Sequence, residues 1–327
     1  MKKIVLSILF MSIFLTGFGQ KSTEDFNPYG KPIGLIFTHF RTVFSDGETK
    51  PSFGITRAYL GYEYNFSKEW YAKVILDVGD PKVGAFQLAA YLKNAYINYK
   101  KGNFKAYFGM ISTTQFKVSE KIWGYRYIMK SFQDAYRFNS SADLGFNIDY
   151  KFADFISVDF SIINGEGYKV IQSDDNVRPG IGTTIKPVKN ITARVFVDYV
   201  GNEVKQQSLA TFLAYTGKKL IVAGEYNYQK NYDRVDGQDF YGTSFFATYK
   251  PSGKIKLFGR FDDLNSVTIE GESKPWHIGK DGQLLMTGVE FNPIKGVKLT
   301  PNFRLWNPED ESKPNSTFIY LNCELRF

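Results

Sequence analysis

The side chains best suited to act on a ligand gather in one irregular stretch, residues 111–140. Five of them are basic: Lys117, Lys121, Arg126, Lys130 and Arg137. Only Glu120 and Asp134 oppose them within the stretch. Clustered positive charge lowers the cost of bringing an anion into a narrow passage. If the stretch faced solvent, the same charges would only keep a loop hydrated. The residue types alone support both interpretations.

Groups for catalysis or metal binding are sparse. His39 in "FTHFR" and His277 in "GESKPWHIGKDG" have no neighbouring nucleophile and orienting carboxylate that would complete a catalytic set. The single Cys323 excludes an intrachain disulfide and a multi-cysteine metal site. The glycines punctuate strands and turns and do not form a phosphate-cradling loop. We therefore predict no catalytic residue, no metal site and no cofactor.

A two-residue alternation predicts the elements that position the basic stretch. In "ITARVFVDY", apolar Val195 and Val197 alternate with Arg194 and Asp198. The same period recurs along most of the chain, with turn signals between the segments. It predicts sixteen strands, an even number, as closed antiparallel barrels require: 32–40, 53–65, 69–79, 88–100, 103–111, 141–151, 155–164, 178–187, 190–200, 207–216, 219–230, 240–250, 254–264, 282–292, 296–306 and 317–327. Pro179 and Pro187 weaken the segment 178–187, so fourteen strands remain an alternative.

Composition favours a membrane barrel over a soluble sandwich. Phe, Trp and Tyr make up 17% of the chain, yet its mean hydropathy is −0.28. Alternating strands explain this combination, because their apolar and polar positions cancel in any average. Most predicted strands reach the roughly ten residues that cross a bilayer at a tilt, whereas sandwich strands average about five or six. The predicted fold is an all-β, transmembrane, antiparallel up-and-down barrel.

One parity of the strands carries the charged side chains, and a barrel of about sixteen strands leaves an aqueous channel for them to face. The basic side chains predicted to face this lumen are Arg57, Lys73, Lys105, Arg194, Arg260, Arg304 and Arg326. Acidic residues share the same parity, so most of these charges are expected to pair across the wall. The inserted loop 111–140 has helix-compatible spacing over 122–136 and would either narrow the channel from inside or cap it from outside.

The two ends of the chain predict export and barrel closure. Lys2 and Lys3 precede an apolar run, followed by small or polar residues, which is the pattern of a secretory signal peptide over residues 1–20. A short segment, 21–31, then leads into a single barrel, 32–327. The last ten residues, "FIYLNCELRF", alternate as far as Phe327. Such a strand is suited to pair with the first strand and close the ladder.

The chain resembles a known family in its layout. The carriers are "RAYLGYEYNFSKEWYAKVILDVG", "LKNAYINYKKGNFKAYFGM", the basic loop and "NSSADLGFNIDYKF". Together they are similar to the phosphate-selective porin O and P family and its Gram-negative relatives. The resemblance implies a sixteen-stranded, usually trimeric outer-membrane barrel that passes small anions through a basic constriction. It also implies that the barrel assembly machinery recognises the strand ending at Phe327. Where many relatives have Arg before the Asp of "SSADLG", this chain has Ala142.

These observations predict a porin for passive diffusion of small ions or hydrophilic solutes, with a possible preference for anions such as phosphate. Outer-membrane lipid would surround the barrel. Two alternatives remain: a barrel enzyme, and a surface-binding barrel without an open channel. We expect no nucleic-acid partner, because strand parity separates the basic residues from most aromatic ones.

Overall fold

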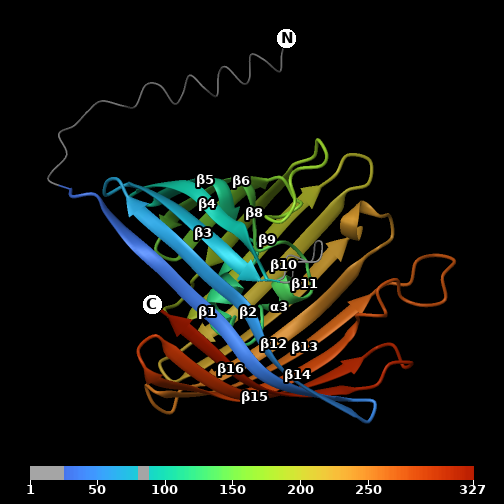
Figure 1. Ribbon diagram of the computed structural model, residues 1–327. Helices are drawn as coiled ribbons and strands as arrows, with labels where there is room; N and C mark the ends of the chain where they lie inside the picture. The colour runs from blue at the N-terminus through green and yellow to red at the C-terminus, as the bar shows by residue number, and fades with distance from the viewer. Residues whose placement is uncertain (1–25, 80–87) are drawn as a thin grey trace.

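The computed structural model describes residues 26–79 and 88–327, which form one closed antiparallel barrel (Figure 1). The predicted signal peptide, 1–20, lies outside the described residues. Sixteen strands make up the described barrel: β1 (Tyr29–Ser45), β2 (Glu48–Asn65), β3 (Trp70–Gly79), β4 (Ala89–Lys101), β5 (Phe104–Ser112), β6 (Ala142–Ala153), β7 (Ile156–Ile163), β8 (Arg178–Ile185), β9 (Ile191–Val200), β10 (Gln206–Thr216), β11 (Leu220–Lys230), β12 (Phe240–Tyr249), β13 (Ile255–Ser266), β14 (Gly282–Ile294), β15 (Val297–Pro308) and β16 (Ser316–Arg326).

Each strand pairs with its neighbours in the chain, and β1 pairs with β16 to close the barrel. This last ladder runs from Leu35 opposite Arg326 to Ser45 opposite Ser316. Beyond it, the Gly34 and Phe327 backbones exchange hydrogen bonds of 3.0 and 3.1 Å. The predicted up-and-down barrel of sixteen strands is therefore confirmed. The fourteen-strand alternative is wrong, because β8 pairs with both β7 and β9 although it contains a proline.

The alternation in the sequence separates an apolar outer surface from a polar inner one. In β9, Val195 is 50% exposed on the outside while Arg194 is 3% exposed on the inside. Leu213, Phe245 and Leu285 are each at least half exposed on other strands. An apolar surface this extensive is unfavourable in water and suits a lipid environment. None of the helices in the described ranges is long and apolar enough to span a membrane.

The first two strands are longer than the alternation predicted, with 17 residues in β1 and 18 in β2. Their connection is the dipeptide Asp46-Gly47, whose φ angles are +51° and +72°. Two successive residues with positive φ make the tight hairpin turn that matches strand twist, so pairing continues up to the turn. The resulting hairpin projects from the barrel at the lower right of Figure 1.

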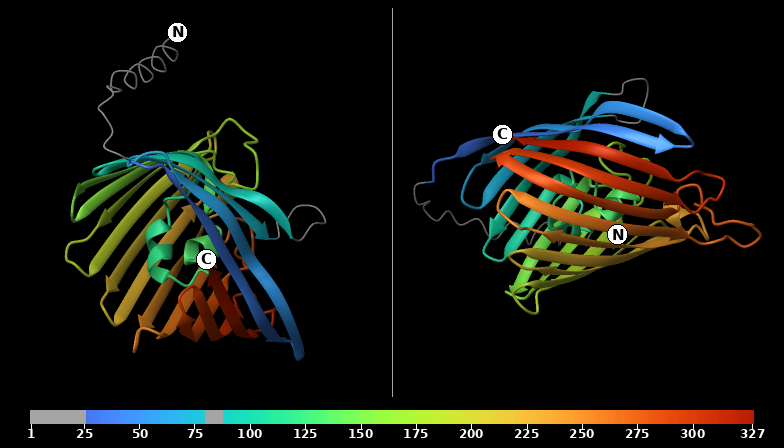
Figure 2. Two further views of the ribbon diagram at one scale, coloured as in Figure 1. Left: turned by 60° about the vertical axis from the view of Figure 1, so that its left-hand side comes forward. Right: turned by 90° about the horizontal axis from the view of Figure 1, so that it is seen from below.

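The connections differ in length at the two ends of the barrel. Short turns join β2 to β3, β4 to β5 and the later pairs of that series, and we call this the short-turn end. At the opposite, long-loop end, residues 113–141 connect β5 to β6. This connection, here called the inward loop, enters the barrel, where Figure 2 shows its helical segments in green surrounded by strands. The inward loop positions the candidate site.

Candidate functional site

The inward loop contains two short helices and no continuous one. The helix α2 (Lys117–Trp123) ends at Gly124, whose φ of +71° is the left-handed conformation that glycine favours at helix ends. The helix α3 (Phe132–Ala135) is one turn long. The prediction of a helix over 122–136 is therefore wrong, because residues 124–131 between the two helices are not helical. Gly124 reverses the chain, and the indole Nε1 of Trp123 then donates to the Met129 carbonyl at 2.8 Å, closing the bend.

Aromatic side chains anchor the inward loop to the lumen wall. Trp123, Tyr127 and Phe132 are at most 1% exposed. The ring of Trp123 lies 5.1 Å from that of Phe246 on β12, and it also contacts Phe258 on β13 at 6.0 Å between centroids. Buried aromatic contacts of this kind dominate packing energy. They place the loop inside the barrel, so the interpretation of residues 111–140 as an external cap is wrong.

Polar side chains of the wall bind the irregular backbone of the loop. Arg260 on β13 donates to the Lys130 carbonyl at 2.7 Å, and Arg304 on β15 donates to the Ile128 carbonyl at 2.9 Å. The Tyr127 hydroxyl donates to Oε2 of Glu290 on β14 at 2.8 Å. Buried carbonyls need such partners because water cannot reach them. These wall side chains thus hold the loop in place.

Two buried ion pairs fasten the base of the loop. Arg194 on β9 makes two bonds to the Asp159 carboxylate, of 2.7 and 2.9 Å, and donates to the Thr114 carbonyl at 2.9 Å. Arg178 on β8 makes a similar pair with Asp198, at 2.9 and 3.0 Å. Bidentate pairs of this kind give geometric specificity. Arg194 was among the predicted lumen residues, whereas Arg178 was missed because it stands at the very start of its strand.

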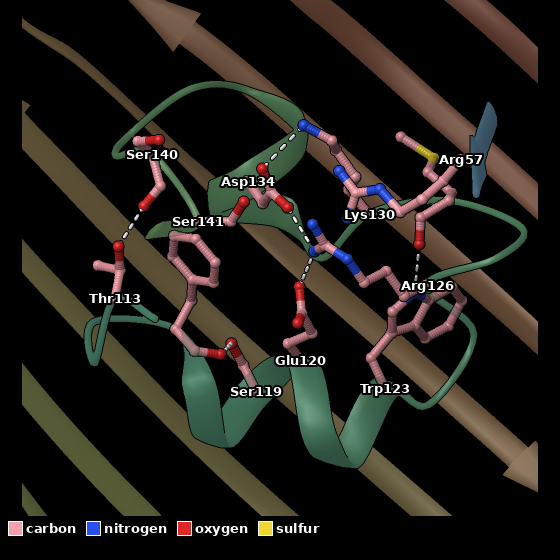
Figure 3. A network of polar contacts seen from close by, with 12 residues as sticks. Arg57, Thr113, Ser119, Glu120, Trp123, Arg126, Lys130, Asp134, Ser140 and Ser141 are labelled. Carbon is pink, nitrogen blue, oxygen red and sulfur yellow. Dashed lines mark hydrogen bonds and ion pairs between the residues drawn. The ribbon is translucent and has the colours of Figure 1, made fainter. Parts of the chain in front are cut away.

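Arg126 is the centre of a charged network within the loop (Figure 3). Its guanidinium bonds the carboxylates of Glu120 and Asp134, and Lys130 Nζ lies 2.8 Å from Asp134. Burial alone would raise the pKa of Asp134, but the charges of Arg126 and Lys130 outweigh it and hold that pKa well below its ordinary value. The Asp134 carboxylate therefore stays ionised, and keeps its pairs with Arg126 and Lys130, well into the acidic range.

The opposite wall, formed by β2 to β4, carries cations beside tyrosine rings. Arg57 lies 3.1 Å from Asp77, and its guanidinium lies 4.8 Å from the centroid of the Tyr59 ring. Lys93 is 4% exposed and lies within electrostatic reach of Arg57 and Arg126. Lys93 was missed because of a bulge. Leu92 and Asn94 pair with adjacent residues of β3, so Lys93 between them is unpaired and turns inward.

The five predicted constriction residues lie at three levels. Lys117 and Lys121 line a cavity of about 730 Å³ at the short-turn end. Lys130 and Arg137 line a cavity of about 450 Å³ at the long-loop end. Arg126 bonds acidic residues on both sides of this division. Of these five, only Arg126 stands where the inward loop faces the β2–β4 wall, and we call this part of the lumen, between loop and wall, the narrow level.

The remaining predicted lumen residues are spread along the barrel. Lys105 lines the short-turn cavity. Lys73 lies 4.0 Å from Glu63. Arg326 is largely exposed at the short-turn end, 3.8 Å from Glu324. These three do not approach the charged network around Arg126, so the structure separates them from the narrow level.

The combination of a closed barrel, a lumen lined by polar side chains and a loop folded inward can be compared with known structures. The chain has the fold of outer-membrane porins. It aligns with the outer membrane channel DcaP of Acinetobacter baumannii at a TM-score of 0.67 and 12% identity, covering 96% of this chain and 100% of that one. For OprB of Pseudomonas putida the values are 0.70, 9%, 91% and 94%. For an anion-selective porin from Comamonas acidovorans they are 0.65, 11%, 92% and 100%. No protein-family model and no curated protein matches the sequence.

Within this porin fold, the histidines do not form a nucleophile and base pair. His277 Nδ1 lies 2.7 Å from one oxygen of Asp281, and the Ser266 hydroxyl donates to the other oxygen at 2.5 Å. The serine is thus bound to the carboxylate and not to the imidazole. His39 bonds the Thr56 hydroxyl at 3.2 Å. Across residues 26–79 and 88–327, no cluster of three or more His, Cys, Asp or Glu side chains could hold a metal ion.

Proposed function

We propose that this protein is an outer-membrane porin that allows passive diffusion of small hydrophilic solutes and prefers anions. The observation that carries the anion preference is the imbalance of pairing in the lumen. Most of its carboxylates are engaged by cations, and others, such as Glu225, by amide donors, while several of its lysines are not engaged by carboxylates. The charge left to act on a passing solute is therefore positive.

Two carboxylates that face the narrow level are held by cations. Asp77 is bound by Arg57, and Asp134 by Arg126 and Lys130. Further along the wall, the same holds for four other pairs: Asp159 with Arg194, Asp198 with Arg178, Asp262 with Arg260, and Glu290 with Lys256. A paired carboxylate presents little net charge to a solute beyond the pair. These acids therefore contribute little attraction for cations.

Three lumen lysines make no ion pair with any described carboxylate. They are Lys93 beside the narrow level, and Lys105 and Lys121 in the short-turn cavity. Lys121 is exposed to the cavity, so its charge acts directly on solutes there. Positive charge on either side of a narrow level lowers the barrier to anions and raises it for cations.

A non-enzymatic role is supported by the geometry of the group formed by Ser266, His277 and Asp281. The Asp281 carboxylate is occupied by both Ser266 and His277, which leaves no oriented serine and imidazole pair. The anion-selective porin from Comamonas acidovorans, which shares the fold, adds support by analogy alone.

The outer surface supports the predicted partners. We propose that outer-membrane lipid covers the apolar belt, that the barrel assembles as a homotrimer, and that the assembly machinery recognises the strand ending at Phe327. The trimer is tested by comparing the gel mobility of the purified protein before and after heating. An unheated sample that migrates only at the monomer position would contradict the trimer.

The test of the channel is the conductance of the full chain, purified from outer membranes and inserted into a planar bilayer. We expect stepwise insertion events and, under a potassium chloride gradient, a zero-current potential whose sign reports chloride preference. Replacing Lys121 with Glu reverses an unpaired charge in the short-turn cavity and should weaken that preference. Replacing Arg126 with Glu would place three carboxylates together, and their repulsion would disturb the loop. Arg126→Gln removes the charge without this repulsion and is therefore the informative variant at the narrow level.

The matched control is Lys50→Glu. Lys50 lies near the tip of the projecting hairpin and is highly exposed, so its charge is remote from the lumen. A folded protein that gives no conductance steps would refute the porin. Cation preference in the unmodified protein would refute the anion preference alone. An equal effect of Lys50→Glu and Lys121→Glu would show that selectivity does not arise in the lumen.

A further inference from the structure

The "SSADLG" segment at the start of β6 holds a second loop, and porin function as proposed above leaves this arrangement unexplained. Asp143 is 2% exposed and makes no ion pair with any described cation. Its carboxylate accepts three backbone N–H groups: Leu144 at 2.8 Å, Gly165 at 2.8 Å and Gly167 at 3.1 Å. A buried carboxylate satisfied only by backbone donors fixes the conformation of the segment that supplies them.

The segment held in this way is the beginning of the β7–β8 connection, "NGEGYK". The Tyr168 N–H donates to the Ala142 carbonyl at 3.0 Å, so the segment lies against the base of β6. Gly165 and Gly167 have φ of +117° and +87°, which glycine tolerates best. A Cβ on Gly167 would lie 2.4 Å from the Ser140 hydroxyl oxygen, so the segment and the end of the inward loop are in close contact. This packing fixes where the next side chain points.

That next side chain, Tyr168, covers Lys93. The Lys93 ammonium lies 3.6 Å from the centroid of the Tyr168 ring and donates to the Ser141 hydroxyl at 2.5 Å. Tyr168 and Ser141 both line the long-loop cavity, whereas Lys93 does not. The ring therefore stands between that cavity and the ammonium group. A ring face attracts a cation, so the Tyr168 ring and the Ser141 hydroxyl are the contacts that hold the Lys93 ammonium group in its buried position.

We propose that Tyr168 is a specificity-determining residue of the channel: its ring shields Lys93 from solutes in the long-loop cavity, and Asp143 is the positioning residue that holds it there. This inference rests on the proposed channel function. In the wild-type protein the Tyr168 ring lies between an anion in the cavity and the Lys93 ammonium group. The anion is therefore attracted by the Lys93 charge but does not contact Lys93. The ring thus prevents a passing anion from binding tightly to Lys93 and stalling there.

Removal of the ring should expose Lys93 to the cavity. In Tyr168→Leu, whose side chain is shorter and has no ring face, the preference for chloride over potassium should rise by about twofold or more, because an unshielded charge now acts on the ions. Multivalent anions such as phosphate should block the chloride current in this variant at lower concentrations than in the wild type. Tyr168→Phe keeps the ring face and should behave as the wild type in both measurements.

The dependence on Lys93 separates shielding from a general loosening of the loop. In the Lys93→Gln background, Tyr168→Leu should change neither the permeability ratio nor the phosphate block. Asp143→Asn replaces an acceptor oxygen of the carboxylate by an amide donor and should reproduce the effect of Tyr168→Leu in a Lys93-dependent manner. Asp175→Asn is the matched control, because Asp175 is an exposed carboxylate in the same connection.

The planar-bilayer recordings distinguish the two levels of the argument. A wild-type protein without conductance would overturn the channel itself. A conducting wild type whose selectivity and phosphate block are unchanged in Tyr168→Leu would overturn only the shielding role. An effect of Tyr168→Leu that persists without Lys93 would likewise overturn it. If Asp143→Asn fails to fold, as judged by gel mobility before heating, the comparison of Tyr168→Leu with Tyr168→Phe still decides the question.

Discussion

The replacement of Trp123 by Ala tests whether aromatic anchors set the shape of the channel. Trp123 is 1% exposed, and its ring contacts the rings of Tyr125, Phe246 and Phe258 at 5.0, 5.1 and 6.0 Å. The guanidinium of Arg260 lies 4.9 Å from the ring centroid. Truncation of a buried Trp to Ala costs about 3–5 kcal/mol. Because Trp123 takes no part in the barrel ladder, this loss should fall on the docking of the inward loop.

A loss of about 3–5 kcal/mol multiplies the undocked population of the loop by roughly a hundredfold to several thousandfold. We therefore expect Trp123→Ala to show larger single-channel conductance, more open-channel noise and weaker ion discrimination in planar bilayers. Far-ultraviolet circular dichroism should remain that of an intact barrel.

The control is Trp70→Ala, which removes a ring at the end of β3 that packs on Tyr99 at 4.7 Å, away from the loop. A correctly folded Trp123→Ala protein with wild-type conductance, noise and selectivity would refute the reasoning. It would mean that the polar contacts to the wall suffice to hold the loop.

Three further predictions follow from the loop and the ladder. Asp134→Asn should raise the open-channel noise above that of the wild type, and this difference should persist from pH 7 to about pH 4, because the charges of Arg126 and Lys130 hold the pKa of Asp134 well below the ordinary carboxyl range and its stabilisation is lost only as the pH falls further. Tyr127→Phe removes a buried hydroxyl with two partners, at a cost of about 1–3 kcal/mol, and should give faster hydrogen exchange in the inward loop but a smaller conductance change than Trp123→Ala. Gly145→Val, on β6, would place a Cβ 2.2 Å from the Ile162 carbonyl oxygen of β7 and should lower the thermal midpoint of the barrel, whereas Gly253→Val, in an open turn, should not.

The barrel was predictable because each strand separates lipid from water. Apolar and polar residues therefore alternate along each strand, and this alternation predicts most strand limits within a few residues. The exceptions have local causes. The Asp46-Gly47 turn extends the first hairpin, and the bulge at Lys93 reverses which parity of β4 faces inward. A bulge leaves little trace in the sequence, since the apolar parity shifts at only one position.

The candidate site was less predictable because its geometry depends on contacts between distant residues. Tyr127 and Glu290, for example, are 163 positions apart. The charged residues of the inward loop predicted a role in ion passage, but its aromatic residues determine where the loop lies. The rings in "IWGYRYIM" were a usable signal, because so many apolar rings are unfavourable in a solvated loop. The division of the five basic residues among three levels could not be read from their spacing.

The one-sided attachment of the inward loop has a consequence for how variation in this protein should be interpreted. Nearly all hydrogen bonds and ion pairs between the inward loop and the described strands run to β6 through β16, and on the β2–β4 wall Lys93 bonds only Ser141, at the very end of the loop. Substitutions on the first set of strands should therefore register in measurements of folding and thermal resistance. Substitutions at the inward-facing positions of β2 to β4 should change the conductance and ion selectivity of the channel while leaving folding intact. A library of variants randomised only at the inward-facing positions of β2 to β4 should therefore yield folded channels with altered solute selectivity.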